Sequence, residues 1–540
     1  MAEKGVFVRS ASGLVRAMSP VDTMLYNWLT MTIFGTALYV VIWGPLSFPG
    51  GNVILAGVLT AVLGAPGFIA VAMLACSMPR SGGDYLFSSR ILHPAIGFGI
   101  NFSCMVVWMG FWNTLAGEQL SSMAFNPLLT YFGLATNSES LINIAAWCVS
   151  TDGKVIITLV HLALVYVILV KGLKVYLWIQ NYLMVPIVLA AIAIVAFVFM
   201  SSSHGQFVQS FNSFMMPYAK NPDYYSYIMQ TAKNAGYSGI APFSLYDTMG
   251  MIAIAWGALM WASWGVQQLG EIKHAGFLRS QLIAIIGALV MACVSFIIVA
   301  GTTFATVGQD FLGSVGYLVV NQPDALVWQV RPNVFYYAAM LAPHWILVAI
   351  ISLGFWMSIF QIYCNSTLGG TRLLIAQAFD QVLPKYLAKV NKAGSPTGAL
   401  NFLMVVSIFY ILIYNYWPNF YGYTLSIAAA NVVGFLFGSY SSSVLFPYRM
   451  KEVYNRSPIA KYKIGNVPLI TILGTWGCGW LICILYIYFT TPALGIVAPP
   501  SLALIFGLIV ISFVIYYVAK WYRSTKGIDL SLTFKEIPPD

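Results

Sequence analysis

Charged residues are scarce in this chain. Only 8% of its 540 residues are Asp, Glu, Lys or Arg, whereas a soluble domain carries roughly 25%. A chain this poor in charge cannot cover a globule with polar surface, so most of its surface is expected to face lipid. No polar stretch is long enough to form a separate domain. The composition therefore excludes a soluble multidomain protein.

Motifs for metal binding and catalysis are also missing. The seven cysteines show no CxxC spacing and no cluster with histidine, so neither a metal site nor a disulfide framework is expected. No HExxH motif, nucleophile elbow, phosphate loop or pair of catalytic carboxylates is present, and an enzyme is not expected. Lys4, Arg9 and Arg16 precede the first apolar run without a cleavage site, so no removable signal peptide is expected.

Long apolar runs fill the rest of the chain. Hydrophobic residues make up 59% of it, and the mean hydropathy is +0.80. A bilayer core of ~30 Å needs about 20 apolar residues, and lipid offers no partner to bare backbone groups, so such runs must be helical. We predict an all-α polytopic membrane protein with about twelve transmembrane helices, near 22–47, 53–78, 95–125, 153–171, 175–200, 246–268, 278–305, 339–371, 398–417, 423–447, 467–490 and 500–521.

The basic residues predict the orientation of these helices. If the N-terminus is cytoplasmic, all but four of the 26 lysines and arginines fall on the cytoplasmic side, as the positive-inside rule requires. This topology accounts for the net charge of +10 without a nucleic acid partner. We expect a multi-pass plasma membrane protein surrounded by lipid, with both termini cytoplasmic. The four outer residues are Lys154, Lys220, Lys233 and Arg331.

Two outer segments, near 201–245 and 306–338, are longer than the others. The first is rich in Tyr, Phe, Asn and Ser and is expected to hold a short amphipathic helix around 223–236. An extracellular cap and a solvated loop are both compatible with its composition.

Three segments on the cytoplasmic side carry recognisable patterns. Residues 79–90 read PRSGGDYLFSSR. The paired glycines permit a tight turn, and Arg80, Asp84 and Arg90 can form ion pairs that hold one conformation. Residues 270–275 read GEIKHA, and residues 369–385 read GGTRLLIAQAFDQVLPK, followed by SPTGAL.

Together these segments resemble the amino acid–polyamine–organocation (APC) family of permeases. Its members carry a PRSGG-E/D-Y loop after helix 2, a GEIKNP-like stretch after helix 6 and an R-x5-A-x-D-G-x-x-P segment after helix 8. Here His274-Ala275 replaces Asn-Pro and Asp380-Gln381 replaces Asp-Gly. The resemblance runs from about Ser19 to Pro468, across ten helices. It implies a secondary transporter of amino acids or related amines, whose partner is a small-molecule substrate.

The resemblance also implies a 5+5 inverted repeat in which helices 1 and 6 are broken near mid-membrane. The substrate then lies between the two breaks, where free N–H and carbonyl groups suit a carboxylate and an ammonium or cation. The implied units are the first repeat at 1–200, an extracellular loop at 201–245, the second repeat at 246–450, and helices 11 and 12 with a tail at 451–540.

The residues next to the two implied breaks are the ones expected to bind the substrate. On helix 1 the family's Gly-x-Gly falls on 33–35, with the β-branched Ile33 in place of the first glycine. On helix 6 a register that requires a deletion matches 261–267, whereas the gapless register places the break near 257–261. Both bring Trp261 to the substrate as an aromatic wall. The expected residues are Thr32, Ile33, Phe34, Gly35, Thr36, Gly257, Met260, Trp261 and Trp264.

No residue stands out as the coupling group. Some relatives place a lysine on helix 5, but 175–200 contains no charge. A sodium ion would need carbonyls of helix 1 and hydroxyls of helix 8, where Ser358 is the candidate, so no metal site is firm. His161 on helix 4 and Glu118 toward the outer end of helix 3 are titratable groups inside the spans. Sodium symport, proton coupling and substrate exchange therefore stay open.

Two alternatives share this composition. A channel predicts polar stripes along several helices, whereas these runs are mostly apolar with isolated Ser, Thr and Asn. A transport-inactive nutrient sensor or subunit of the same fold would have the same sequence features. The substrate's side chain and the oligomeric state stay open.

Overall fold

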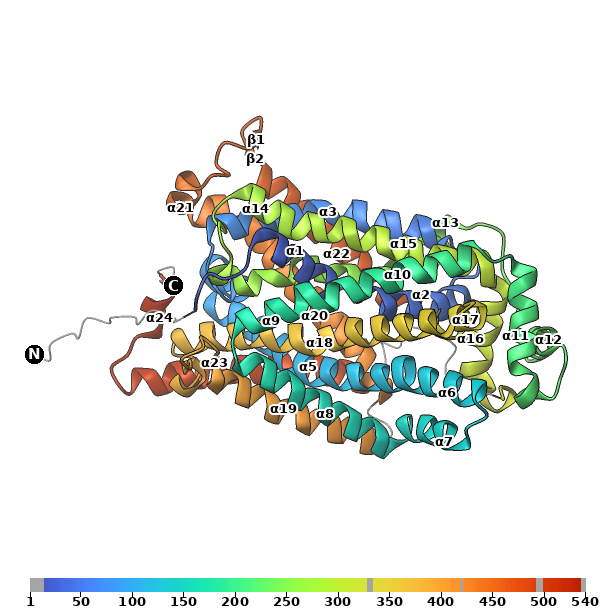
Figure 1. Ribbon diagram of the computed structural model, residues 1–540. Helices are drawn as coiled ribbons and strands as arrows, with labels where there is room; N and C mark the ends of the chain where they lie inside the picture. The colour runs from blue at the N-terminus through green and yellow to red at the C-terminus, as the bar shows by residue number, and fades with distance from the viewer. Residues whose placement is uncertain (1–13, 328–333, 418–420, 492–498, 536–540) are drawn as a thin grey trace, which may run out of the picture.

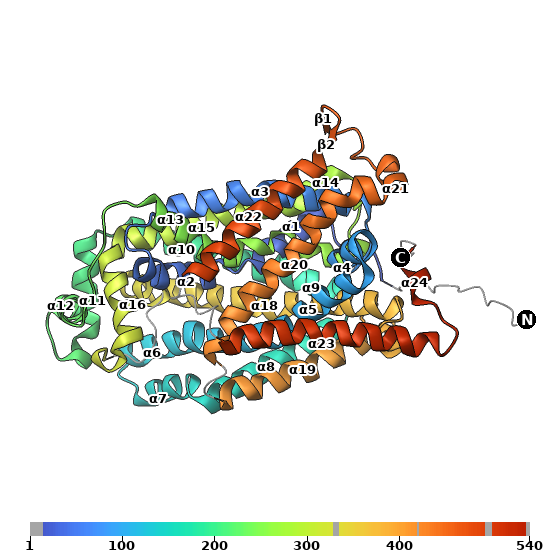
Figure 2. The same cartoon turned by 180° about the vertical axis from the view of Figure 1, so that it is seen from behind.

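All twelve predicted apolar runs coincide with helices. The computed structural model describes residues 14–327, 334–417, 421–491 and 499–535, with the backbone alone at 35–40, 42, 107–109, 421–432 and 500–501. The helices lie side by side in an elongated bundle, and α1 begins at the same end at which α24 lies (Figures 1 and 2). The fold is therefore all-α and polytopic, as predicted.

Within the described ranges, ten continuous helical segments are long and apolar enough to cross a membrane. They are Val53–Ser77, Pro94–Ala135, Thr151–Val170, Leu173–Met200, Leu245–Glu271, Leu278–Val307, Trp345–Phe379, Thr397–Tyr416, Leu469–Thr490 and Leu502–Ser524. The other two predicted runs are also helical. The first is divided into α1 (Pro20–Thr30) and α2 (Ile33–Ser47), and the other is α20 (Tyr421–Arg449).

Several spans are built from more than one element. Four contain π-helical segments or a 3-10 segment, which interrupt the regular α-helical hydrogen bonding. Their parts are α5 (Pro94–Gln119), η2 (Leu120–Phe125) and α6 (Asn126–Ala135); α9 (Leu173–Ile179), η3 (Gln180–Met184) and α10 (Val185–Met200); α13 (Leu245–Leu259) and η4 (Met260–Glu271); and α14 (Leu278–Leu282), η5 (Ile283–Gly287) and α15 (Ala288–Val307). The unbroken spans are α3 (Val53–Ser77), α8 (Thr151–Val170), α18 (Trp345–Phe379), α19 (Thr397–Tyr416), α22 (Leu469–Thr490) and α23 (Pro499–Ser524).

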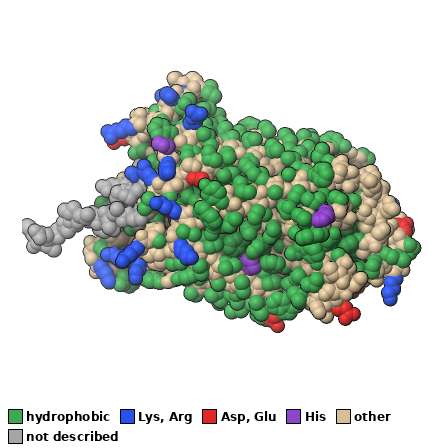
Figure 3. Space-filling view, in the orientation of Figure 1, with side chains coloured by type: hydrophobic (Ala, Val, Ile, Leu, Met, Phe, Trp, Pro, Cys, Tyr) green, Lys and Arg blue, Asp and Glu red, His purple; other side chains and the backbone are tan. Residues whose placement is uncertain are grey.

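Lysine and arginine side chains gather at one end of the bundle, and hydrophobic side chains cover its middle (Figure 3). We call this end, formed by residues 79–93, 272–277, 380–396 and 450–468, the basic end. The residues 136–150, 201–244, 308–327 and 334–344 form the opposite end. Short elements at the basic end are α4 (Gly83–Phe87), η1 (Ser88–Leu92), η7 (Lys385–Ala388), α21 (Lys451–Arg456), α24 (Leu530–Thr533) and the antiparallel pair β1 (Lys463–Ile464) and β2 (Val467–Pro468).

Helices cap the opposite end. They are α7 (Glu139–Cys148), α11 (His204–Ala219), α12 (Tyr224–Asn234), α16 (Gln309–Asn321), η6 (Pro323–Ala325) and α17 (Val334–Leu341). The expected helix around 223–236 corresponds to α12, whereas α11 was not expected. Tyr225 stacks on Phe311 with 4.5 Å between ring centroids, and Phe211 lies edge-on to Phe311 at 5.1 Å. This aromatic packing favours a cap over a solvated loop.

The last two spans lie at the periphery. α22 packs on α3 and α20, and α23 packs on α5 and α20. The outer face of α23 is uncovered (Figure 2), with Val510, Val514 and Trp521 exposed. Exposed apolar side chains in the middle of a bundle are expected where lipid is the solvent. Polar groups that can bind a substrate are therefore expected inside the bundle.

Candidate functional site

The first span is broken at Met31 and Thr32. α1 ends at Thr30 and α2 begins at Ile33. Thr32 has φ 42° and ψ 68°, a left-handed conformation that is unfavourable for a β-branched residue. Such strain persists where the surrounding structure imposes it, commonly at functional sites. The break precedes the predicted 33–35, because Gly35 lies within α2 and does not supply the interruption.

The start of α2 lacks a cap from the side chain of its own N-cap residue. Thr32, its N-cap residue, makes no side-chain hydrogen bond to the first turn. α1 in contrast begins with a capping box between Ser19 and Asp22. The first N–H groups of a helix lack partners within the helix and lie at the positive end of its dipole. The buried start of α2 at Ile33 and Phe34 can therefore receive a carboxylate.

The sixth span changes its geometry at Met260. α13 ends at Leu259, and η4 continues to Glu271 as a 3-10 helix of 12 residues. Runs of 3-10 helix beyond three or four residues are uncommon, and within a longer helix they often mark a hinge. This position agrees with the gapless register near 257–261. Among the described residues, nothing lies within 4 Å of a Cβ atom placed on the half-buried Gly257, so none of them fills the space at this point of the break.

One face of η4 contacts α1. With three residues per turn, residues 262, 265 and 268 align on this face. The backbone N–H of Gly265 donates to Asn27 Oδ1 at 2.6 Å, and the Gln268 side-chain amide lies 3.1 Å from the Tyr26 hydroxyl. A Cβ atom at Gly265 would come within 2.7 Å of the Thr23 methyl. Because glycine permits this approach, the two broken spans are joined beside their breaks.

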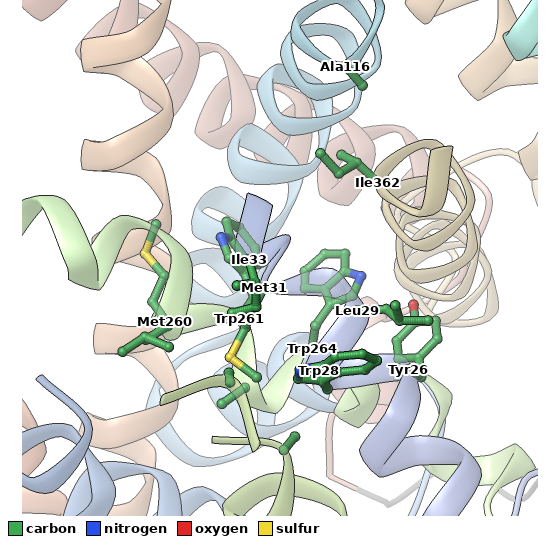
Figure 4. Packing of buried hydrophobic residues seen from close by; sticks show 14 of the residues in the cluster. Tyr26, Trp28, Leu29, Met31, Ile33, Ala116, Met260, Trp261, Trp264 and Ile362 are labelled. Carbon is green, nitrogen blue, oxygen red and sulfur yellow. The ribbon is translucent and has the colours of Figure 1, made fainter. Parts of the chain in front are cut away.

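A second face of η4 carries an aromatic wall, which consists of Trp112, Trp261, Trp264 and Phe435. The Trp261 and Trp264 rings lie 5.5 Å apart at 81°. Trp112 of α5 lies 6.2 Å from Trp261, and Phe435 of α20 lies 5.8 Å from Trp264. Figure 4 shows Met260 and Trp261 next to Met31 and Ile33. Three spans therefore contribute to an aromatic surface at the breaks.

The structure brings most of the expected substrate-binding residues together. Thr32, Ile33 and Phe34 follow the first break, and Gly257, Met260, Trp261 and Trp264 surround the second. Phe34 stacks on Phe355 of α18 with 4.3 Å between centroids, which directs its ring toward α18. The side chains of Gly35 and Thr36 lie outside the described residues.

A buried polar cluster beside the first break was not predicted. We call it the Asn365 cluster; its members are Tyr26, Thr30, Tyr176, Gln361 and Asn365. Asn365 Nδ2 donates to Tyr26 O at 3.1 Å and to Thr30 Oγ1, while its Oδ1 accepts from Tyr176 Oη at 2.6 Å. Gln361 Nε2 also donates to Asn365 Oδ1, at 2.8 Å. The Asn365 amide of α18 thus links α1 to α9 by hydrogen bonds. In the sequence, the i,i+4 spacing of Gln361 and Asn365 is the only pattern that indicates this cluster.

The carbonyls at the end of α1 already have donors. Leu29 O accepts from the Thr32 N–H at 3.1 Å, and Thr30 O accepts from Thr32 Oγ1 at 3.2 Å. Trp28 O accepts from the Met31 N–H at 3.2 Å. A sodium site was expected to use these carbonyls together with Ser358, which is buried on α18. Occupied carbonyls weaken that hypothesis without testing it.

The two titratable candidates join neighbouring helices away from the breaks. His161 Nδ1 lies 2.7 Å from Ile157 O, and Trp356 Nε1 donates to His161 Nε2 at 3.0 Å. Only the neutral ring protonated at Nδ1 can make both bonds. Glu118 accepts from Tyr414 Oη at 2.6 Å and lies 3.9 Å from Lys154 Nζ. These contacts favour structural roles for His161 and Glu118.

The turn after the second span depends on its paired glycines, as predicted. Gly82 has φ 79°, in the left-handed region that favours glycine. A Cβ atom at Gly83 would lie 2.5 Å from Val266 O, and the Gly82 N–H donates to Gln267 O at 2.9 Å. This turn is therefore seated directly on the end of η4.

Two buried ion pairs connect separate segments at the basic end. Arg90 forms a two-point contact with Asp380 at 2.5 and 2.7 Å, and Tyr85 Oη donates to the same carboxylate at 2.8 Å. Arg372 binds Glu271 through two bonds of 2.7 Å. The prediction that Arg80, Asp84 and Arg90 pair within their own segment was wrong for Arg90, because its guanidinium reaches α18.

Asp84 does not form the expected ion pair with a residue of its own segment. Gln267 Nε2 donates to its Oδ2 at 2.5 Å, and Ser439 Oγ donates to its Oδ1. Both donors are neutral, and they enclose the side chain of Asp84 between η4 and α20.

Comparisons with known proteins agree with this geometry. The family model described as "Amino acid permease" matches residues 25–519, a stretch that includes both broken spans. No curated protein matches the chain. Because the match covers most of the sequence, the chain belongs to the amino acid permease family and is a membrane transporter.

Proposed function

We propose that this protein is a secondary transporter that moves amino acids or related amines by alternating access. The substrate binds between the break of α1–α2 and the break of α13–η4. The observation that carries this proposal is the meeting of two interrupted helices that run in opposite directions. α1 starts at the basic end and α13 starts at the opposite end (Figure 1), and Gly265 and Asn27 join the two spans beside their breaks.

The groups around the breaks suit a zwitterion. The start of α2 attracts a carboxylate through the N–H groups of its first turn and the helix dipole. The Gly257 carbonyl at the change from α to 3-10 geometry accepts from Trp261 Nε1 at 3.1 Å, and its second lone pair can receive an ammonium group. The aromatic wall then contacts the remainder of the substrate, and the space beside Gly257 gives it room.

The same proposal includes the arrangement of the whole bundle. The twelve helical runs form a 5+5 inverted repeat with helices 11 and 12 at the periphery. The basic end faces the cytoplasm, because positively charged loops are retained on that side. The ion pairs Arg90–Asp380 and Arg372–Glu271 hold this end closed, and their separation opens the substrate site to the cytoplasm.

A channel and a transport-inactive sensor are the alternatives. The aromatic wall argues against a channel, because Trp112, Trp261, Trp264 and Phe435 place apolar rings beside the breaks. A sensor would share every contact described above. Only a measurement of flux separates a sensor from a carrier.

Two experiments test the proposal. A thermal-shift screen of the purified protein against amino acids and amines identifies a binder, since a ligand at 100 times its Kd stabilises by about 2.7 kcal/mol. Uptake of that ligand into proteoliposomes is then measured with and without preloaded ligand. Saturable uptake that preloading accelerates supports a carrier. Non-saturating conductance would establish a channel, and binding without flux would establish a sensor.

A further inference from the structure

Asp84 is a buried carboxylate that, among the described residues, has only neutral hydrogen-bond partners. It lies on α4 with 1% of its surface exposed, and its two hydrogen bonds come from Gln267 of η4 and Ser439 of α20. Burial of a carboxylate among neutral groups disfavours its charged form strongly, so such a group tends to bind a proton.

The titratable groups around Asp84 do not compensate its charge. α4 packs against η1, α5, η4, α18 and α20. Of the arginines on these elements, Arg90 is paired with Asp380, Arg372 is paired with Glu271, and Arg449 of α20 donates to Ile91 O and Leu92 O. The other titratable groups are Tyr85 on α4 itself, Cys104 of α5 and Tyr440 of α20, which carry no positive charge. Burial therefore raises the pKa of Asp84 to about 7, although the bonds from Ser439 and Gln267 lower it.

Gln267 has the atom that a proton on Asp84 would satisfy. Its side chain is fully buried, and among the described residues its Oε1 has no hydrogen-bond partner. An unpartnered buried acceptor costs about 1–3 kcal/mol. A protonated Asp84 can donate its O–H to Gln267 Oε1 while Gln267 Nε2 donates to the other carboxyl oxygen. The result is a paired acid and amide in which both side chains are satisfied.

This pair is placed where the basic end must open. The Gly82 N–H donates to Gln267 O at 2.9 Å, and Gly83 packs against Val266 O. Separation of η4 from α4 would break these contacts and admit water to Asp84. Water restores the ordinary acidity of a carboxyl group, with a pKa of ~3.9.

We propose that Asp84 is the proton-binding residue of this transporter. It holds a proton on its carboxyl group while the basic end is closed, and it releases that proton to water when η4 separates from α4. This inference rests on the proposed transport function and assigns a group that makes the opening of the basic end depend on pH. Gln267 is the residue that positions the proton.

The direction of the pH effect follows from the two states. Closure raises the pKa of Asp84, so the closed state gains stability as the pH falls and loses it as the pH rises through about 7. The gain is complete only below the pKa of the hydrated carboxyl, ~3.9. Between about pH 6 and pH 8 the ratio of open to closed protein should rise roughly tenfold.

The test is substrate exchange in proteoliposomes as a function of symmetrical pH. The wild type should exchange faster as the pH rises through about 7. Asp84→Asn, which stays neutral, should exchange at a rate that does not follow pH. Asp84→Glu should restore a pH-dependent rate. Glu139→Gln, which removes an exposed carboxylate at the opposite end, should behave as the wild type.

Two results overturn the inference. An Asp84→Asn protein with the wild-type pH profile, or an Asp84→Glu protein without one, shows that another group binds the proton. If Asp84→Asn does not fold, the Asp84→Glu profile decides alone, because its midpoint must move if residue 84 titrates. If the exchange rate of the wild type does not change with pH, the inference is also contradicted, but the proposed transport function is not. Absence of exchange at every pH overturns the transport function and this inference with it.

Discussion

Loss of one charge from the Glu271–Arg372 pair should open the basic end. Both side chains are nearly fully buried, at 1% and 3% exposure. Arg372 donates from Nε and Nη2 to the two carboxylate oxygens at 2.7 Å, and its Nη1 donates to Thr371 Oγ1 at 2.9 Å. The pair links the end of η4 to α18. We expect Glu271→Gln and Arg372→Gln each to destabilise the closed arrangement.

The size of the effect follows from the burial. Removal of one partner from a buried ion pair costs ~3–5 kcal/mol, because the other charge is left uncompensated. Since 1.4 kcal/mol corresponds to a factor of ten, the ratio of closed to open protein should fall by roughly two orders of magnitude or more. The double variant carries no uncompensated charge, so it should recover much of the closed population.

Cysteine accessibility measures this shift. In a background without the seven native cysteines, Ser263→Cys places a thiol on η4, where the native side chain is buried. A hydrophilic thiol reagent added from the basic side should label it at least ~100-fold faster in either single variant than in the parent. The double variant should label at an intermediate rate. The reasoning would be refuted if the single variants are labelled at the parent's rate. It would also be refuted if the free-energy change in the double variant equals the sum of the changes in the two single variants.

Three further outcomes follow from the topology, the site and the coupling. A cysteine at position 220 should be labelled from outside intact cells and one at position 80 should not; the reverse pattern would contradict the orientation. Gly35→Leu and Trp261→Ala should each abolish or greatly weaken uptake at normal surface expression, because the first fills the start of α2 and the second removes an aromatic contact worth ~0.5–2 kcal/mol to a cation. Normal uptake by both would place the pocket elsewhere. His161→Ala should keep the pH profile of uptake, since the bonds of His161 require a neutral ring; a lost profile would make His161 the coupling group.

Hydropathy was sufficient to locate the spans. A run of apolar residues long enough to cross a bilayer has few alternatives to a helix, which is why all twelve predicted runs are helical. The same signal could not locate α11, because its polar and aromatic residues carry no long apolar run. It also could not show that residues 369–379 continue α18, since their polar side chains contact other segments of the protein and not lipid.

The positions of the breaks were harder to predict. A glycine pattern placed the first break at 33–35, but the strained residue is Thr32, which only the surrounding packing can hold at φ 42°. The sequence also could not show which residues pair with the buried charges. Arg90 and Asp380 are 290 residues apart in the sequence, and nothing local to either one indicates the other. Periodicity describes a residue's own helix, whereas these contacts depend on the tertiary arrangement.

The central claim is that substrate binds between the two breaks, and protection of Gly257→Cys tests it most directly. A Cβ atom at Gly257 or at Gly479 would meet no described atom within 4 Å, but Gly479 lies on the peripheral helix α22. In the background without native cysteines, a small membrane-permeable maleimide is applied to each variant with and without the substrate identified by the thermal-shift screen. At 100 times its Kd, the substrate should slow labelling at position 257 about 100-fold and leave position 479 unchanged. The account would be contradicted if the substrate does not slow labelling at position 257, or if it slows labelling at position 479 to the same extent.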